Sequence, residues 1–139
     1  MPIDHFIRPD IRFRAATLRA VKHFAGERPW HGTLSQRRMK YRRLSRKLAG
    51  IYGIDAPLIK FARTVSDDNP FASGWYDRLL NIIGLEGRYS VVTLLHEFGH
   101  ALGKDERLTR IWSINLFRLC FPHSNARAVE GEWLYVPAP

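Results

Sequence analysis

The chain has 139 residues, which favours a single domain, and its 45% hydrophobic and 12% aromatic residues can build one ordinary core and exclude wholesale disorder. The single cysteine, Cys120, excludes an intrachain disulfide framework and suits a reducing compartment, so a cytoplasmic protein is expected. The formal net charge is +9. Because the N-terminus has no apolar h-region we expect no signal peptide, and because no run of 18 apolar residues occurs we expect no membrane span.

Two helices are predicted in the first 50 residues. Apolar residues recur at helical spacing from Asp10 to Phe24, and the stretch "GERPWHG" then interrupts the pattern. A second helix is expected from Thr33 to Ala49, because Thr33 is a suitable N-cap and Gly50 a suitable stop.

The second of these helices is unusually basic. No Asp or Glu occurs from Arg28 to Ile54, whereas eight bases do: Arg28, Arg37, Arg38, Lys40, Arg42, Arg43, Arg46 and Lys47. Such a block can attract nucleic acid or another acidic surface, which makes residues 33–49 a candidate nucleic-acid-binding helix. The alternative is a solvated helix face without a partner.

The middle of the chain is predicted to form strands. Residues 56–64 are short, partly alternating and bounded by turn residues. Residues 74–76 and 80–85 are expected to form two further strands, with "YDR" at the turn between them. These segments predict a small sheet.

Helical periodicity returns after the sheet. A helix is expected over residues 91–102, capped by Ser90 and followed by Gly103. Asp105 can cap the next helix, which Pro122 is expected to end, and residues 131–137 read as a final strand. The order of elements predicts an α+β fold.

The segment "HEFGH" carries the clearest chemistry. His96 and His100 lie four residues apart on a helix and can therefore point imidazole nitrogens at one ion, which zinc binds at about 2.0–2.1 Å. Glu97 lies roughly 100° around the helix, where it can act as general base on a zinc-activated water rather than as a third ligand. This is the HExxH signature of zinc metallopeptidases.

The motif is specific for so short a pattern. With six His and six Glu in the chain, random order gives roughly 0.01 such matches. The alternative is a pair of core histidines satisfied by hydrogen bonds.

At these residues the chain resembles a known group of enzymes. "YSVVTLLHEFGHALG" is similar to the active-site helix of zincin metallopeptidases, and "ASGWYDRLLNIIGL" to the strands before that helix in small ImmA/IrrE-type or minimal gluzincin domains. The resemblance covers residues 58–122. It implies His96 and His100 as Zn²⁺ ligands, Glu97 as general base, and an edge strand within residues 80–85 that pairs with an extended peptide. We therefore expect one zincin-like domain over residues 1–139, with a basic helical extension (1–50) and a catalytic core (56–137).

The third zinc ligand departs from the gluzincin pattern. The helix after the motif holds no carboxylate from Arg107 onward. Glu106, six residues after His100 with a glycine between, has a spacing similar to that of the metzincins, although their downstream methionine is missing. We favour Glu106 as third ligand. The alternatives are Asp105, His123, Glu130, Glu132 or no third ligand.

The resulting hypothesis is a zinc-dependent peptidase acting on a peptide or protein substrate. Tyr76 or Tyr135 is a candidate donor to a tetrahedral oxyanion, although each is also a suitable packed aromatic. The competing hypotheses are a nucleic-acid-associated basic protein with a degenerate or scaffold zincin core, and a domain in which HEFGH is only structural. Sequence leaves the oligomeric state, the substrate and the cleavage specificity open.

Overall fold

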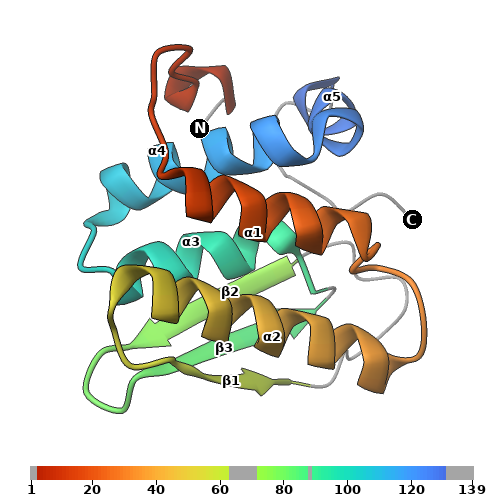
Figure 1. Ribbon diagram of the computed structural model, residues 1–139, viewed down its shortest axis with the longest axis vertical. Coiled ribbons are helices and arrows are strands. Elements are labelled where there is room, and N and C mark those ends of the chain that lie inside the picture. Colours follow the sequence, from red (N-terminus) through yellow and green to blue (C-terminus); the bar gives the residue numbers. More distant parts are fainter. Residues whose placement is uncertain (1–2, 63–71, 88, 131–139) are drawn as a thin grey trace.

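The computed structural model describes residues 3–62, 72–87 and 89–130, and it has the α+β architecture expected (Figure 1). Its described elements are η1 (Ile3–Phe6), α1 (Ala15–Gly26), α2 (Leu34–Tyr52), β1 (Leu58–Phe61), β2 (Ala72–Asp77), β3 (Ile82–Gly87), α3 (Val91–Ala101), α4 (Glu106–Cys120) and α5 (Pro122–Glu130). The strand expected over residues 131–137 lies outside the described residues.

The three strands form a mixed sheet in the order β1-β3-β2. β1 is parallel to β3 and β2 is antiparallel to it, so β3 is paired on both sides. The expectation that residues 80–85 form an edge strand is therefore wrong, and the edge strands are β1 and β2. The parallel β1 pairing displaces the second strand of the hairpin to the centre, a long-range contact that local periodicity does not encode.

The hairpin turn between β2 and β3 lies two residues later than "YDR". Asp77 accepts a hydrogen bond from the backbone N–H of Leu80 at 3.1 Å, and Asn81 adopts a positive φ of 53°. Both are typical turn conformations for these residue types, because their short polar side chains bond locally and tolerate left-handed backbone. Sequence pattern located this turn only approximately.

Helix α3 lies between the sheet and α4 (Figure 1). It begins where Ser90 accepts a hydrogen bond from the backbone N–H of Thr93, and Gly103 follows its end with φ 87°, both as predicted. Its apolar stripe of Val91, Leu94, Leu95 and Phe98 is at most 1% exposed. This burial on both sides fixes the rotation of α3, and with it the direction in which its polar residues point.

The two N-terminal helices differ from prediction at one end each. α1 begins at Ala15 rather than Asp10, because Asn115 of α4 binds the backbone of Phe6 and Arg8 and holds the preceding chain away from a helical path. α2 has the expected Thr33 cap, with a full capping box to Gln36. It continues through Gly50 and ends at Gly53, which has φ 67°.

Helix α4 is capped by Asp105, which accepts from the backbone N–H of Leu108 at 2.8 Å. Pro122 follows its end as predicted, but it also starts α5, which the sequence did not indicate. A proline fits the first helical position because no N–H is needed there.

One cluster of buried hydrophobic side chains connects most of these elements. It contains residues from α1, α2, β1, β3, α3 and α4, including Val21, Leu48, Ile83, Leu95 and Leu116. The basic N-terminal helices therefore share a core with the HEFGH helix. No helix within the described ranges is both long enough and apolar enough to cross a membrane.

Candidate metal centre

The two histidines of the motif point to one place. His96 and His100 lie one turn apart on α3, and their ring centroids are 5.0 Å apart. Metal-binding atoms of His96, Glu97 and His100 all lie within 4.8 Å of one another. The two histidine side chains are 20% and 24% exposed, so the group opens to solvent on one side.

Glu106 closes the group from the neighbouring helix. It is the first residue of α4, and its two carboxylate oxygens each lie 3.0 Å from an imidazole, Oε1 from Nε2 of His96 and Oε2 from Nε2 of His100. Arg110, one turn further along α4, donates from Nε to Oε1 at 3.0 Å. The structure therefore brings together all four residues that the sequence singled out.

The other candidate third ligands either have a different role, lie on another helix, or fall outside the described residues. Asp105 is engaged as the N-cap of α4. His123 is exposed on α5, which begins after the far end of α4 from Glu106. The side chain of Glu130 and all of Glu132 lie outside the described residues. Glu106 is thus the one candidate whose carboxylate contacts both imidazoles in the part of the chain that is described.

The hydrogen bonds of His100 define which of its nitrogens can bind a cation. Its Nδ1 lies 3.0 Å from the carbonyl oxygen of Lys104, and because a carbonyl only accepts, Nδ1 carries the hydrogen. In the neutral ring Nε2 then carries no hydrogen and presents its lone pair as an acceptor. This atom lies 3.0 Å from the carboxylate oxygen Oε2 of Glu106. Two acceptors this close require either a hydrogen on one of them or a metal ion between them.

The contact between α3 and α4 positions Glu106. Thr109 is fully buried and donates from its hydroxyl to the carbonyl oxygen of His96 at 2.6 Å. This approach requires Gly99, since a Cβ there would lie 1.9 Å from the Thr109 hydroxyl oxygen. The sequence analysis missed Thr109. Its only signal was the small residue inside the motif, which left room for close packing.

Glu97 lies beneath the histidines in a more buried position. The residue is 6% exposed, and its Oε1 is 3.9 Å from Nε2 of His96. Burial raises the pKa of Glu97 to about 7, although the nearby His100 opposes this shift. A carboxyl group with such a pKa can both accept and release a proton near neutral pH.

Strand β2 passes close to Glu97. A Cβ on Gly74 would lie 2.6 Å from the Thr93 methyl group and 3.1 Å from Cγ of Glu97, so only glycine lets the strand approach α3 this closely. Beside this contact is a cleft of about 330 Å³, lined by Tyr76, Arg78, Glu97, His100 and Lys104. Its position gives a small molecule or peptide access to the group.

Of the two tyrosines considered as oxyanion donors, the structure describes only Tyr76. Tyr76 lines the cleft, but its hydroxyl donates to Oδ1 of Asn81 at 2.8 Å. Tyr135 lies outside the described residues. Arg78 and Lys104, which the sequence analysis passed over, contribute two further potential donors to the cleft wall.

The donor set fits a zinc ion. Ligands about 2.1 Å from a tetrahedral ion lie about 3.4 Å apart, so the 3.0 Å contacts of Glu106 need to lengthen by only a few tenths of an ångström. Burial lowers the pKa of His96, which keeps its imidazole neutral and able to bind metal at pH 7. Burial alone would raise the pKa of Glu106, but His96, Arg110 and His100 together lower it, which keeps this carboxylate charged. Two imidazoles and a carboxylate would leave a fourth position for water.

Comparison with known proteins adds no family to these observations. No family model, no curated protein and no solved structure matches the chain. The functional argument therefore depends on the site itself.

Proposed function

We propose that this protein is a zinc-dependent metallopeptidase. The observation that carries the proposal is the convergence of His96, His100 and Glu106, in which one carboxylate spans two imidazole nitrogens at 3.0 Å each. A buried general-base candidate, Glu97, lies directly beside them. This combination of three ligands, one buried acid and an open cleft is what hydrolysis by an activated water requires.

His96, His100 and Glu106 would hold the ion. When bound, zinc supplies a Lewis acid that polarises the scissile carbonyl and lowers the pKa of a water. The Lys104 carbonyl fixes the tautomer of His100, and Arg110 orients the Glu106 carboxylate through its hydrogen bond. Such supporting contacts hold ligand side chains in their binding orientation.

Glu97 would carry the proton. Its carboxylate accepts a proton from the attacking water and donates it to the nitrogen of the departing amine, so the group ends the cycle in its starting state. Burial raises the pKa of Glu97 to about 7 in the metal-free protein, and a bound cation would favour the carboxylate that accepts the proton. The close approach of Gly74 supports this role, because it holds the Glu97 side chain against strand β2.

We assign substrate binding to the free edge of strand β2. It pairs with β3 on one side, and no other described strand pairs with its opposite edge. That edge would bind an extended peptide through main-chain hydrogen bonds, as exposed strands commonly do. Because β2 also packs on α3, a peptide held there would run beside Glu97 and the cleft wall. This assignment moves the expected substrate-binding edge from residues 80–85 to residues 72–77.

Cleavage of a general protein substrate, such as fluorescein-labelled casein, tests the proposal. Wild type should release labelled peptides, a zinc chelator should abolish release, and added zinc should restore it. Glu97→Gln should lower the rate at least about 100-fold with metal content unchanged. Glu27→Gln, which alters a glutamate at the end of α1 outside the metal group and the cleft, is the matched control and should leave the rate unchanged. Equal rates in wild type and Glu97→Gln would exclude Glu97 as general base.

A further inference from the structure

The positive charge of the chain is concentrated in one segment. Residues 11–54 contain twelve Lys and Arg and a single acid, Glu27, whereas the rest of the chain contains ten bases and twelve acids. The net charge of residues 11–54 is thus +11, against −2 for the remainder. The basicity of this protein is a property of α1, α2 and the segments that flank them.

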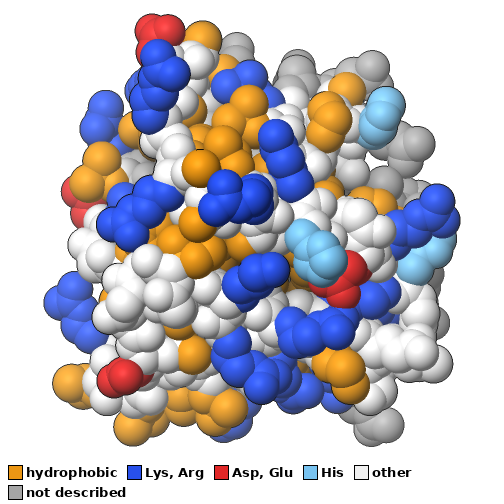
Figure 2. Space-filling view, in the orientation of Figure 1, with side chains coloured by type: hydrophobic (Ala, Val, Ile, Leu, Met, Phe, Trp, Pro, Cys, Tyr) orange, Lys and Arg blue, Asp and Glu red, His pale blue; other side chains and the backbone are white. Residues whose placement is uncertain are grey.

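These two helices form one face of the molecule. α1 and α2 are antiparallel neighbours: Arg14 donates to the Ile51 carbonyl at one end, and Arg43 pairs with Glu27 at the other (Figure 1). Figure 2 shows Lys and Arg side chains spread across this face, with few acidic side chains among them. The Lys and Arg side chains of both helices therefore contribute to one continuous positively charged face.

Some of the bases have structural roles within the protein. Arg38 donates to the Tyr89 hydroxyl at 2.9 Å, Lys40 donates to two backbone carbonyls, and Arg42 lies over the Phe61 ring. Others remain available. Arg19, Lys22 and Lys47 make no hydrogen bond or ion pair within the described residues, and Arg46 makes only a 3.4 Å bond to a carbonyl of its own helix.

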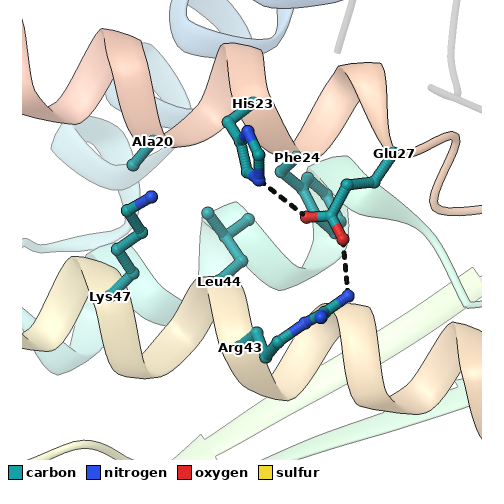
Figure 3. A pocket seen from close by; sticks show the side chains of 7 residues that line it. All are labelled: Ala20, His23, Phe24, Glu27, Arg43, Leu44 and Lys47. Atoms are coloured by element: carbon teal, nitrogen blue, oxygen red, sulfur yellow. Dashed lines mark hydrogen bonds and ion pairs between the residues drawn. The ribbon is translucent and has the colours of Figure 1, made fainter.

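A shallow pocket between the two helices collects part of this charge (Figure 3). Its volume is about 120 Å³, and Ala20, Phe24 and Leu44 form its apolar part. Lys47 and Arg43 reach toward it from α2, while Glu27 contacts Arg43 and lies 3.7 Å from His23 (Figure 3). With one carboxylate and two permanent cations the pocket keeps a net positive charge.

The arrangement is unfavourable for an isolated helix. Arg42 and Arg46, and likewise Arg43 and Lys47, are like-charge pairs four residues apart, which destabilise a helix by about 0.2–0.5 kcal/mol each. α2 has no acid of its own to offset them. A polyanion seated on this face would remove the repulsion.

We propose that the outer face of α1 and α2 binds the phosphate backbone of duplex DNA. Duplex DNA presents dense negative charge, and Arg19, Lys22, Arg46 and Lys47 are free to contact phosphates. The proposal is independent of the metal centre. It concerns a separate surface, and neither proposal requires the other.

Two other polyanions suit the face less well. A membrane surface would require apolar side chains between the bases, yet α1 has no exposed large hydrophobic residue, and those of α2, Leu34 and Met39, precede the Arg42–Lys47 segment. Single-stranded nucleic acid would require aromatic platforms for its bases, and the one aromatic among the exposed large hydrophobics of the described residues, Trp75, is on β2.

The test is the salt dependence of binding to a 20-base-pair duplex of arbitrary sequence, measured by fluorescence anisotropy. Four phosphate contacts give a slope of about −3.6 in log affinity against log salt, so the wild-type Kd should rise about 150-fold between about 50 and 200 mM salt. Arg46→Gln/Lys47→Gln should reduce this rise to about 12-fold. Lys60→Gln/Arg107→Gln removes the same charge from exposed sites on β1 and α4 and should leave the rise near the wild-type value.

Circular dichroism and urea midpoints would verify that both double variants are folded. An equal loss of slope in the two double variants would overturn the proposal, because the effect would then follow from net charge alone. Tighter binding to single-stranded DNA, or to vesicles of anionic phospholipid, would also overturn it. Unchanged DNA binding by Glu97→Gln is expected, and it separates this face from the metal centre.

Discussion

Glu97 makes the metal-free protein less stable as pH rises, and its replacement by glutamine should reverse that effect. Burial raises the pKa of Glu97 from 4.5 to about 7. The folded state therefore binds this proton more tightly than the unfolded chain does. The stability associated with the protonated group is fully present below about pH 4.5 and is lost as pH rises through about 7.

The magnitude follows from the two pKa values. A pKa of about 7 in place of 4.5, at about 1.4 kcal/mol for each pH unit, corresponds to about 3 kcal/mol. The conversion is appropriate here because the residue is only 6% exposed. Glutamine has the same shape and stays neutral, so Glu97→Gln retains the stability that the wild type loses between pH 5 and pH 8.5.

Urea unfolding in the presence of a chelator measures this difference. The free energy of unfolding of Glu97→Gln minus that of wild type should increase by about 3 kcal/mol from pH 5 to pH 8.5. His96 and His100 are present in both proteins, so the difference reports Glu97 together with its electrostatic coupling to His100. With zinc added the difference should shrink, because a nearby cation favours the carboxylate. A difference that does not change with pH would refute the reasoning.

Three further substitutions test the supporting structure. Thr109→Val removes the hydroxyl that binds the His96 carbonyl while keeping the side-chain shape, so zinc affinity should fall about 10-fold in a competition titration; unchanged affinity would contradict the positioning role. Gly74→Ala should displace Glu97 and reduce casein cleavage at least about 10-fold while zinc content stays the same, and full activity would show that the close approach is unimportant. Gly50→Ala should raise the free energy of unfolding by about 0.5–1 kcal/mol, because the position is helical and a Cβ there meets nothing within 4 Å; destabilisation in urea would contradict that conformation.

Local signals explain the parts of the fold that sequence could predict. Thr33, Ser90 and Asp105 all cap helices as expected, because an N-cap depends on a few neighbouring residues. The position of Glu106 was expected from a spacing similar to that of the metzincins, in which a glycine turn precedes the third ligand. A glycine with positive φ at residue 103 ends α3, and the short turn after it returns the chain to the histidines.

Contacts between distant residues explain the failures. The central position of β3 depends on its parallel pairing with β1, more than twenty residues earlier in the chain. The late start of α1 depends on Asn115, which binds the chain at Phe6 across 109 residues. Thr109 acquires its role only when α4 packs on Gly99. None of these contacts leaves a periodic trace in the sequence.

Zinc content tests the central claim most directly. Elemental mass spectrometry of the purified protein, after exposure to zinc and removal of excess, should find about one zinc per chain in wild type. His100→Ala and Glu106→Gln should each lose most of it, whereas the matched controls His31→Ala and Glu86→Gln should retain it. Absence of zinc from wild type, or its full retention in Glu106→Gln, would contradict a metal centre formed by His96, His100 and Glu106.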